Sequence, residues 1–345
     1  MGIKELTPFL KNKAPGSIKI VNLNELKGKI AIDISIFLYK FKYKTNNLIT
    51  KFLDQINRLH LNNIEPIYVF DGIPPEEKKE TINSRKEKII DNNNKLSIII
   101  DDIKKYKDQY ETSNDENIKT HLSSLDEQKR KLEQKMIRIT KEDINNVKYF
   151  FDMLNVKYIQ AEGEADLVCS YLCKHDMVDM VMSEDMDILT SGAKILIRDF
   201  QVSNNKITKI DLNIILTTLN MSYEKWVEFC IMCGCDYIKR IPGLGPKISY
   251  KYLTEYPDKN INEIIDIIKN TKQLNIPENY FVNFKKAKDI FMIYNMPDIN
   301  NIKNLVERNN TLFGNQRDNI RSYLLKYTSL TERKIDNRIN NIFRV

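Results

Sequence analysis

The sequence predicts an α/β fold with a twisted, mainly parallel sheet flanked by helices. Short β-branched and aromatic runs alternate with segments of helical period up to about residue 211, as a parallel sheet requires. With 345 residues, 42% of them apolar, the chain is long enough for one large core or two smaller ones. Beyond Asp211 no strand pattern remains, so the last third is predicted to be helical.

The beginning of the chain predicts a strand–helix–strand unit. A short N-terminal helix is followed by a strand ending at Asp33 and a helix that carries Tyr39. Residues 48–62 place apolar side chains at helical period, and residues 66–70 form a β-branched run that ends just before Asp71.

Residues 76–139 differ from the rest in composition. They contain no Gly or Pro and carry 15 Lys/Arg against 14 Asp/Glu, so the segment is nearly neutral. We expect two long solvated helices with a break near residues 112–117, and a coiled or disordered insertion is the alternative.

Compact structure is predicted to resume at residue 140. Residues 140–143 form a capping box that opens a helix to Leu154. The elements expected next are a strand at 156–160, a helix at 163–175, strands at 178–183 and 194–200, a helix at 221–233 and a Gly-rich turn at 243–245.

Carboxylates stand where apolar runs end or helices begin. These are Asp33, Asp71, Glu164, Asp166, Asp185, Asp187 and Asp236. Strand ends in an α/β sheet line one edge, so acids from distant segments can converge there. Such a group repels itself and cannot stay ionised in a shared cleft unless cations neutralise it. For any single acid, a helix cap or a solvated charge is the alternative.

This oxygen-rich set predicts hard divalent cations. Two Mg²⁺ ions about 4 Å apart would activate a water and stabilise the attacking and leaving oxygens of an in-line phosphodiester attack. No Gly-rich phosphate loop followed by Lys-Ser/Thr is present, which disfavours hydrolysis of nucleoside triphosphates.

Composition restricts the class further. No run approaches the ~20 consecutive apolar residues of a membrane span, and the N-terminus lacks the apolar core of a secretory signal, so we expect an intracellular protein without a membrane partner. The net charge of +7 favours a polyanionic partner, although a Lys- and Asn-rich composition also follows from an AT-rich genome.

The cysteine run Cys230, Cys233 and Cys235 has two interpretations. Zinc or iron–sulfur ligation is possible, but the run lies in an apolar, helix-like segment, where free cysteine commonly packs as a small core residue. Core packing is favoured, and an odd total of five fits a protein without disulfides.

A series of short motifs occurs in a characteristic order along the chain. They are Met1-Gly2-Ile3, Ala31-Ile-Asp33 with Tyr39, Tyr68-Val-Phe-Asp71-Gly72 with Pro74-Pro75, Glu164-Ala-Asp166, Ser183-Glu-Asp185-Met-Asp187, and Gly234-Cys-Asp236-Tyr237 followed by Gly243-Leu-Gly245-Pro-Lys247. Over roughly residues 1–290 they resemble the flap endonuclease branch of the XPG (Rad2) family of structure-specific nucleases.

The resemblance implies a PIN-like 5′ nuclease core with a helical insertion. The expected units are a core at 1–220 (segments 1–105 and about 140–220), a helical arch at 76–139, a helix-turn-helix DNA-binding region at 221–300 that completes the active site, and a helical tail at 301–345.

The resemblance also assigns roles to residues. The seven acids match the family's metal positions, which implies two Mg²⁺ per active site with Mn²⁺ as a substitute. Lys78 and Arg85 match two catalytic cations at the arch base that would steer the scissile phosphate, with ordinary solvated residues as the alternative. Tyr39 resembles an aromatic on which a base stacks, with a core tyrosine as the alternative. Gly2 is expected among the DNA-binding residues.

The Gly-rich turn resembles the family's duplex contact. Gly243, Gly245 and Lys247 would open a helix whose N–H groups meet a phosphate, with a simple helix-start turn as the alternative. K⁺ would be held there by the backbone carbonyls of Arg240, Ile241 and Leu244.

The C-terminal end has the spacing of a clamp-binding peptide. Asp336, Ile339, Ile342 and Phe343 would form a degenerate motif for a PCNA-like sliding clamp, and a plain terminal helix is equally favoured.

Together these features predict a monomeric, Mg²⁺-dependent 5′ flap endonuclease that acts on branched DNA in replication and repair, in the nucleus or another compartment of DNA replication. A 5′ to 3′ exonuclease or junction resolvase of the same family is an alternative, because Asp166 stands where many flap endonucleases have Glu and resembles the exonuclease branch. A catalytically silent DNA-binding scaffold is disfavoured because every acidic position is filled.

Overall fold

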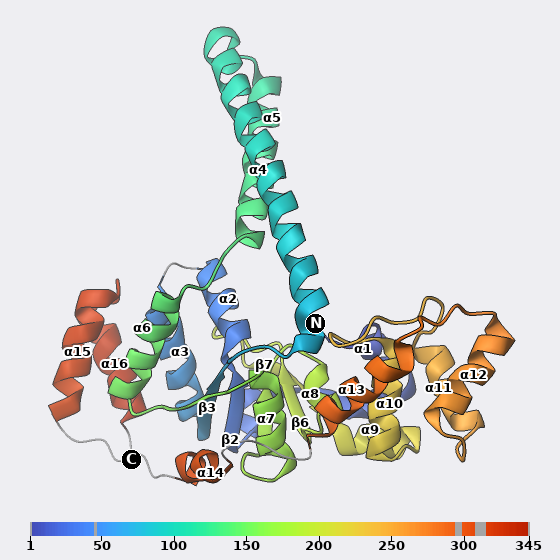
Figure 1. Ribbon diagram of the computed structural model, residues 1–345. Helices are drawn as coiled ribbons and strands as arrows, with labels where there is room; N and C mark the ends of the chain where they lie inside the picture. Colours follow the sequence, from blue (N-terminus) through green and yellow to red (C-terminus); the bar gives the residue numbers. More distant parts are fainter. Residues whose placement is uncertain (1, 45–46, 294–298, 308–314, 344–345) are drawn as a thin grey trace.

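The computed structural model describes residues 2–44, 47–293, 299–307 and 315–343. Within them, one sheet lies between two groups of helices, and a helical arch projects from the body (Figure 1). The strands are β1 (Ile18–Asn22), β2 (Gly28–Asp33), β3 (Ile64–Phe70), β4 (Lys157–Gln160), β5 (Met180–Met182), β6 (Ile195–Arg198) and β7 (Lys206–Asp211).

The sheet has the order β1-β7-β6-β5-β2-β3-β4. β2 pairs in parallel with both β3 and β5, β4 pairs in parallel with β3, and β6 pairs in parallel with β5. The predicted mainly parallel sheet is therefore confirmed. Because the chain places β3 on one side of β2 and β5 on the other, a crevice is expected at the carboxyl end of β2.

β1, at one edge of the sheet, and its neighbour β7 were not predicted. They pair antiparallel with each other, with Ile18 opposite Ile210, and β7 also pairs antiparallel with β6. β1 has no fully buried residue and its partner lies nearly 190 residues away in the sequence, so neither burial nor local pairing marks it as a strand.

The helices form two cores with the sheet. The first contains side chains from α1 (Leu6–Lys13), α7 (Ala165–Lys174), α8 (Asp187–Thr190), α9 (Leu212–Leu219), α10 (Tyr223–Cys233), α11 (Pro246–Glu255), α12 (Ile261–Lys272), α13 (Tyr280–Met292) and α14 (Ile299–Glu307). The second contains side chains from α2 (Ile34–Lys44), α3 (Leu48–Leu61), α6 (Lys141–Met153), α15 (Asn315–Tyr327) and α16 (Glu332–Ile342). Alternation along β2 sends Ala31 into the first core and Ile30 and Ile32 into the second. Short 3₁₀ turns are η1 (Pro15–Ser17), η2 (Leu23–Glu25) and η3 (Glu76–Lys78).

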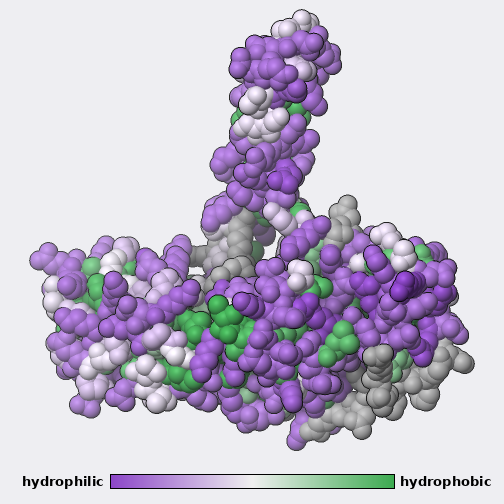
Figure 2. Space-filling model, turned by 180° about the vertical axis from the view of Figure 1, so that it is seen from behind, coloured by the Kyte–Doolittle hydropathy of each residue, from purple (hydrophilic) through white to green (hydrophobic). Residues whose placement is uncertain are grey.

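The arch consists of two long helices, as predicted: α4 (Lys79–Ser113) and α5 (Glu116–Lys135). The break occurs at Asn114, which has φ 51°, and at Asp115, whose side chain caps α5 by accepting a hydrogen bond from the Asn117 N–H. Ile103, Leu122 and Leu125 form a small core between the two helices. Figure 2 shows that the surface of the arch is otherwise predominantly hydrophilic.

Other local predictions can be compared with the structure. Thr140 and Asp143 form the expected capping box of α6. Cys169, Cys173, Cys230 and Cys233 are buried in the first core and Cys235 packs partly buried against it, which confirms the interpretation of the cysteines as packing residues. In the described part of the chain, no helix is both long and apolar enough to cross a membrane.

The clamp-peptide hypothesis disagrees with the packing of α16. Ile339 and Ile342 are only 3% and 7% exposed, and Phe343 is half-buried against the same core. A clamp-binding peptide must offer these side chains to its partner, so the docked helix cannot serve as one. The alternative, a plain terminal helix, describes the structure.

Candidate active site

The structure brings all seven predicted acids together at the carboxyl edge of the sheet. Asp33 ends β2 and Asp71 follows β3; Glu164 and Asp166 begin α7; Asp185 and Asp187 follow β5; and Asp236 follows α10. The electrostatic neighbours of Asp33 include Asp71 and Asp185. Those of Asp166 include Glu164, and those of Asp187 include Asp166 and Asp236. The acids therefore form one group.

Hydroxyl and backbone N–H groups orient the acids that follow β2 and β3. The Ser35 N–H donates to Asp33 Oδ1 at 3.1 Å, and the Ser35 hydroxyl donates to Asp71 Oδ2. The first N–H of α7, that of Ala165, donates to Asp71 Oδ1 at 2.8 Å. The start of α2 and the start of α7 thus hold the two acids on neighbouring strands.

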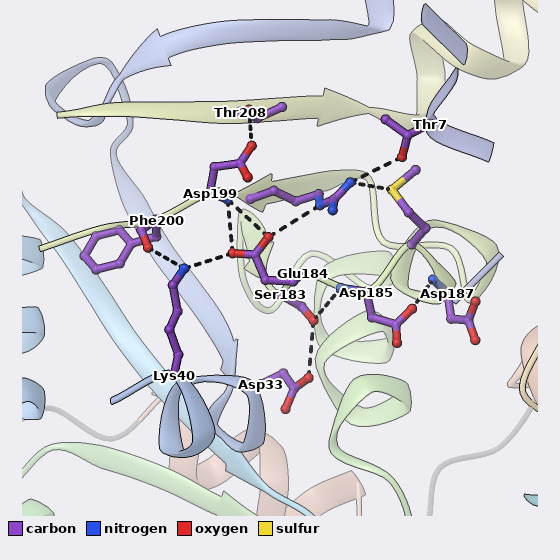
Figure 3. Close-up of polar contacts among 12 residues, drawn as sticks. Thr7, Asp33, Lys40, Ser183, Glu184, Asp185, Asp187, Asp199, Phe200 and Thr208 are labelled. Atoms are coloured by element: carbon purple, nitrogen blue, oxygen red, sulfur yellow. Dashed lines mark hydrogen bonds and ion pairs between the residues drawn. The ribbon is translucent and has the colours of Figure 1, made fainter. Parts of the chain in front are cut away.

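The side chains of the loop after β5 point in two directions (Figure 3). Toward the acids, the Ser183 hydroxyl donates to Asp33 Oδ2 at 3.2 Å and accepts from the Asp185 N–H at 3.2 Å. Glu184 turns the other way, where it meets Lys40 Nζ at 3.2 Å and Arg198 Nε at 3.7 Å. Glu184, between Ser183 and Asp185, therefore anchors the loop on the side away from the acids.

Burial and mutual repulsion disfavour the charged forms of these acids. Burial, followed by the charge of Asp71, raises the pKa of Asp33 to about 7. Burial also raises the pKa of Asp185, and it raises the pKa of Asp166 and Asp187 well above the usual range for a carboxyl group, with neighbouring acids adding to both. The group cannot be fully ionised without added positive charge.

The donor set fits hard divalent cations. All seven ligand candidates are carboxylates, and Asp187 Oδ1 is buried without a hydrogen-bond partner. Among the residues that the structure describes, no three Asp, Glu, His or Cys side chains stand in a geometry that could hold a metal ion. The chemistry of the group nevertheless favours a cation, because a buried oxygen without a hydrogen-bond partner lies within a self-repelling set of carboxylates.

Lys78 supplies positive charge within the group. Its Nζ pairs with Glu164 and lies 3.4 Å from Asp236 Oδ2. Burial alone would lower the pKa of Lys78, but attraction to Asp166 and Glu164 outweighs it and raises the pKa. Tyr237 completes this corner, because its hydroxyl donates to Glu164 Oε2 at 2.6 Å and its ring lies 5.8 Å from Lys78 Nζ.

Gly2 lies against the acids rather than at a distance from them. Its φ is 76°, and a Cβ atom added there would overlap Asp185 Oδ1 and Asp187 Oδ1. Only glycine lets the backbone approach two carboxylates so closely. This contact gives Gly2 a role beside the predicted metal site, whereas its predicted contact with DNA stays a prediction.

The other predicted substrate residues lie on α2 and at the base of the arch. Tyr39 is 52% exposed on α2, which rules out the alternative of a core tyrosine. Arg85 lies on α4 seven residues after Lys78, and its side chain is outside the described part of the structure. Lys78 itself belongs to η3 and precedes α4, so the two cations are not on one continuous helix as expected.

The Gly-rich turn opens α11 beside a basic groove. Gly243 has φ 86°, and Gly245 is the N-cap residue without a side-chain cap. A cavity of about 1210 Å³ runs along this turn and α1, and the cations that line it are Lys13, Arg240, Lys247 and Lys251. The carbonyl of Ile241 accepts the Leu244 N–H at 2.9 Å, so part of the predicted carbonyl set is already engaged within the turn.

Sequence reasoning missed the residues that orient the acids. Ser35 and Ser183 each lie two residues from an acid of the group, a spacing that could have marked them. Tyr237 is part of a quoted motif, but nothing local indicates that its hydroxyl reaches Glu164. The role of Glu184 depends on Lys40 and Arg198, which are distant in sequence.

The fold and the acidic edge define an α/β protein with a PIN-like nuclease core and a helical arch. The XPG N-terminal domain matches residues 1–92, and the XPG I-region matches residues 155–236. Flap endonuclease 1 of Cryptosporidium parvum (strain Iowa II) is 30% identical over 99% of this chain and 70% of its own length. The chain therefore belongs to the XPG family and is similar to its flap endonucleases.

Two further comparisons define the extent of the similarity. Flap endonuclease 1 of Plasmodium falciparum is 30% identical over 100% of this chain, which spans about half (53%) of that relative. The solved catalytic core of Rad2 in complex with a DNA substrate has a TM-score of 0.68 at 19% identity, covering 99% of this chain and 100% of that one. At this identity the structural match establishes the fold.

Proposed function

We propose that this protein is a divalent-metal-dependent 5′ nuclease that hydrolyses phosphodiester bonds near the single-strand/duplex junction of branched DNA with a 5′ flap. The observation that carries the proposal is the gathering of seven carboxylates, from segments far apart in the sequence, into one group at the base of the arch. Divalent-metal dependence is general to the nucleases of this family.

The proposed chemistry divides between the acids and the cations. The seven carboxylates would hold two Mg²⁺ or Mn²⁺ ions, which when bound would supply an activated water and stabilise the attacking and leaving oxygens. Ser35, Ser183 and Tyr237 orient the carboxylates. The ammonium group of Lys78 lies beside Glu164 and Asp236, where it can contact the scissile phosphate. Arg85 would act with Lys78.

The proposed DNA path uses exposed features on both sides of the acids. Tyr39 offers an exposed ring for base stacking, and the basic groove along α1 and α11 suits the phosphates of a duplex. A K⁺ ion bound by the carbonyls of Arg240, Ile241 and Leu244 would support that contact. Of these contacts, the Gly-rich turn and α11 would belong to a DNA-binding unit at 221–300, whereas Tyr39 and α1 would belong to the nuclease core at 1–220.

A substrate panel tests the proposal. Purified protein with Mg²⁺ is offered 5′-flap, double-flap, nicked, gapped and four-way DNA, and the cleavage sites are mapped. We expect cuts near the junction of the flap substrates and none with Asp236→Ala, which should still bind DNA because this carboxylate serves the metals rather than the duplex.

The outcomes separate the alternatives. Preferred stepwise removal of nucleotides from nicked or gapped DNA would indicate the exonuclease activity that Asp166 suggests, and paired cuts in four-way DNA would indicate a resolvase. Absence of cleavage of every substrate, with Mg²⁺ or Mn²⁺, would refute the proposal.

A further inference from the structure

The base of the arch holds the loop that carries Asp236 at two points. Lys78 Nζ lies 3.4 Å from the Asp236 carboxylate, and the Thr81 hydroxyl donates a 2.9 Å hydrogen bond to the Asp236 backbone carbonyl. Residues three positions apart lie on the same face of a helical turn, so one turn of the arch grips both ends of this aspartate.

These contacts join the arch base to the loop between α10 and α11. Asp236 lies in the connection between α10 and α11, where Gly234 leaves the helix with φ 89°. Also at the arch base, Glu77 lies 4.0 Å from Lys286 of α13. Figure 1 shows α4 rising from the body beside these helices.

The contact is not enforced by tight packing. Thr81 is half-buried, and a cavity of about 590 Å³ lined by Thr81, Asp236, Tyr237 and Lys286 lies beside it. The Thr81 hydrogen bond holds the backbone of Asp236 beside this open space.

We propose that Thr81 is a positioning residue that ties the Asp236 carboxylate to the docked state of the arch. It acts through Asp236, so the position of one metal-binding carboxylate depends on whether the arch base contacts the loop that carries Asp236. The inference rests on the proposed function, since it assigns Asp236 to the metals.

Thr81 separates this role from catalysis better than Lys78 does, because its hydroxyl faces a backbone carbonyl and no carboxylate. Thr81→Val removes the donor and keeps the shape of the side chain, whereas Thr81→Ser keeps the donor. Thr112→Val is the matched control: Thr112 is exposed near the far end of α4 and bonds only to carbonyls of its own helix.

The experiment has two measurements. Mn²⁺ binding to the full chain is measured by calorimetry without DNA, and single-turnover cleavage of a double-flap substrate is measured with Mg²⁺ at saturating enzyme. Loss of one hydrogen bond is expected to weaken Mn²⁺ binding and slow cleavage by about 3- to 10-fold in Thr81→Val, with the DNA dissociation constant unchanged. Thr81→Ser should restore both values, and Thr112→Val should match the wild type.

Two results would overturn the inference. One is Mn²⁺ affinity and a cleavage rate at wild-type values in Thr81→Val. The other is a loss of both in Thr81→Ser as large as the loss in Thr81→Val. If the wild type cuts none of the branched substrates, the proposed function fails, and the Mn²⁺ measurement still tests the link between Thr81 and Asp236.

Discussion

At the scale of single residues, the acidic group is oriented by partners that lie far from it in the sequence. Each of the seven acids follows an apolar run or begins a helix, and strand ends meet at one edge of a parallel sheet, so local sequence was sufficient to find them. Gly2, Thr81 and Tyr237 act through partners more than 70 residues away. No local pattern encodes such a contact.

Gly2→Ala tests how closely the backbone must approach the acids. The new methyl group would overlap the carboxylates of Asp185 and Asp187, and alanine is strained at φ 76°. We expect cleavage to fall at least ~10²-fold, because small displacements of catalytic groups cost about that much, while the fold remains. Gly16→Ala, where an added methyl group meets nothing within 4 Å, should cleave normally. Normal cleavage by Gly2→Ala would contradict the described packing.

The raised pKa of Asp33 predicts how stability changes with pH in the absence of metal. The folded state keeps the proton of Asp33 up to about pH 7, whereas the unfolded state releases it near its ordinary pKa of 3.8. Between these pH values the folded state binds more protons than the unfolded state. The free energy of unfolding of the metal-free protein is therefore higher at low pH and falls as the pH rises through this window.

Asp33→Asn should therefore flatten this pH profile. It should also raise the metal-free melting temperature at pH 7.5 by about 2–4 °C, because it removes a charge that is repelled in the folded state. Thermal melts in EDTA from pH 4.5 to 7.5 provide the measurement. Asp91→Asn on the exposed arch is the control, and identical profiles for wild type and Asp33→Asn would refute the expectation.

At the scale of elements, the central strands and the arch were predictable because their signals are local. The arch follows from a long charged segment without Gly or Pro, and its break follows from the Asn and Asp residues at 114–115. In the apolar run at 96–100, Ile99 packs against the small core of the arch, whereas Ile98 and Ile100 are exposed. β1 and β7 were missed because each is defined by its partner.

The small core of the arch predicts a local unfolding unit. Leu125 is 6% exposed and packs with Ile103 and Leu122, the other buried apolar residues described between α4 and α5. Leu125→Ala should lower the free energy of local unfolding of the arch by about 2–4 kcal/mol. The arch should then open while the rest of the molecule keeps its melting temperature. Hydrogen exchange should increase over residues 79–135 alone. The control is Ile98→Ala, 61% exposed on α4, and an unchanged exchange pattern in Leu125→Ala would show that the arch does not depend on this core.

At the scale of the whole molecule, the layered fold was predictable from alternation, but the position of the C-terminal tail was not. α16 packs on α3, and Arg338 Nε pairs with Asp54 Oδ1 at 2.6 Å across 284 residues of sequence. The spacing of Ile335, Ile339 and Ile342 suits both a buried helix face and a binding peptide, so only the partner surface on the body decides between them.

This packing predicts that the intact chain and its free tail differ in clamp binding. Exposing Ile339 and Ile342 from the core would cost on the order of several kcal/mol, so the state with a free tail has a low population. The apparent affinity of the intact chain falls in proportion to that population. We expect a peptide of residues 330–345 and the intact protein, each titrated against a PCNA-like clamp, to differ by at least ~10²-fold if the peptide binds at all. Ile339→Ala should lower the melting temperature and release the helix, whereas Ile20→Ala, 74% exposed on β1, should do neither. Equal affinity of intact chain and peptide would mean that α16 leaves α3 at little cost, and that the spacing of its isoleucines serves a partner after all.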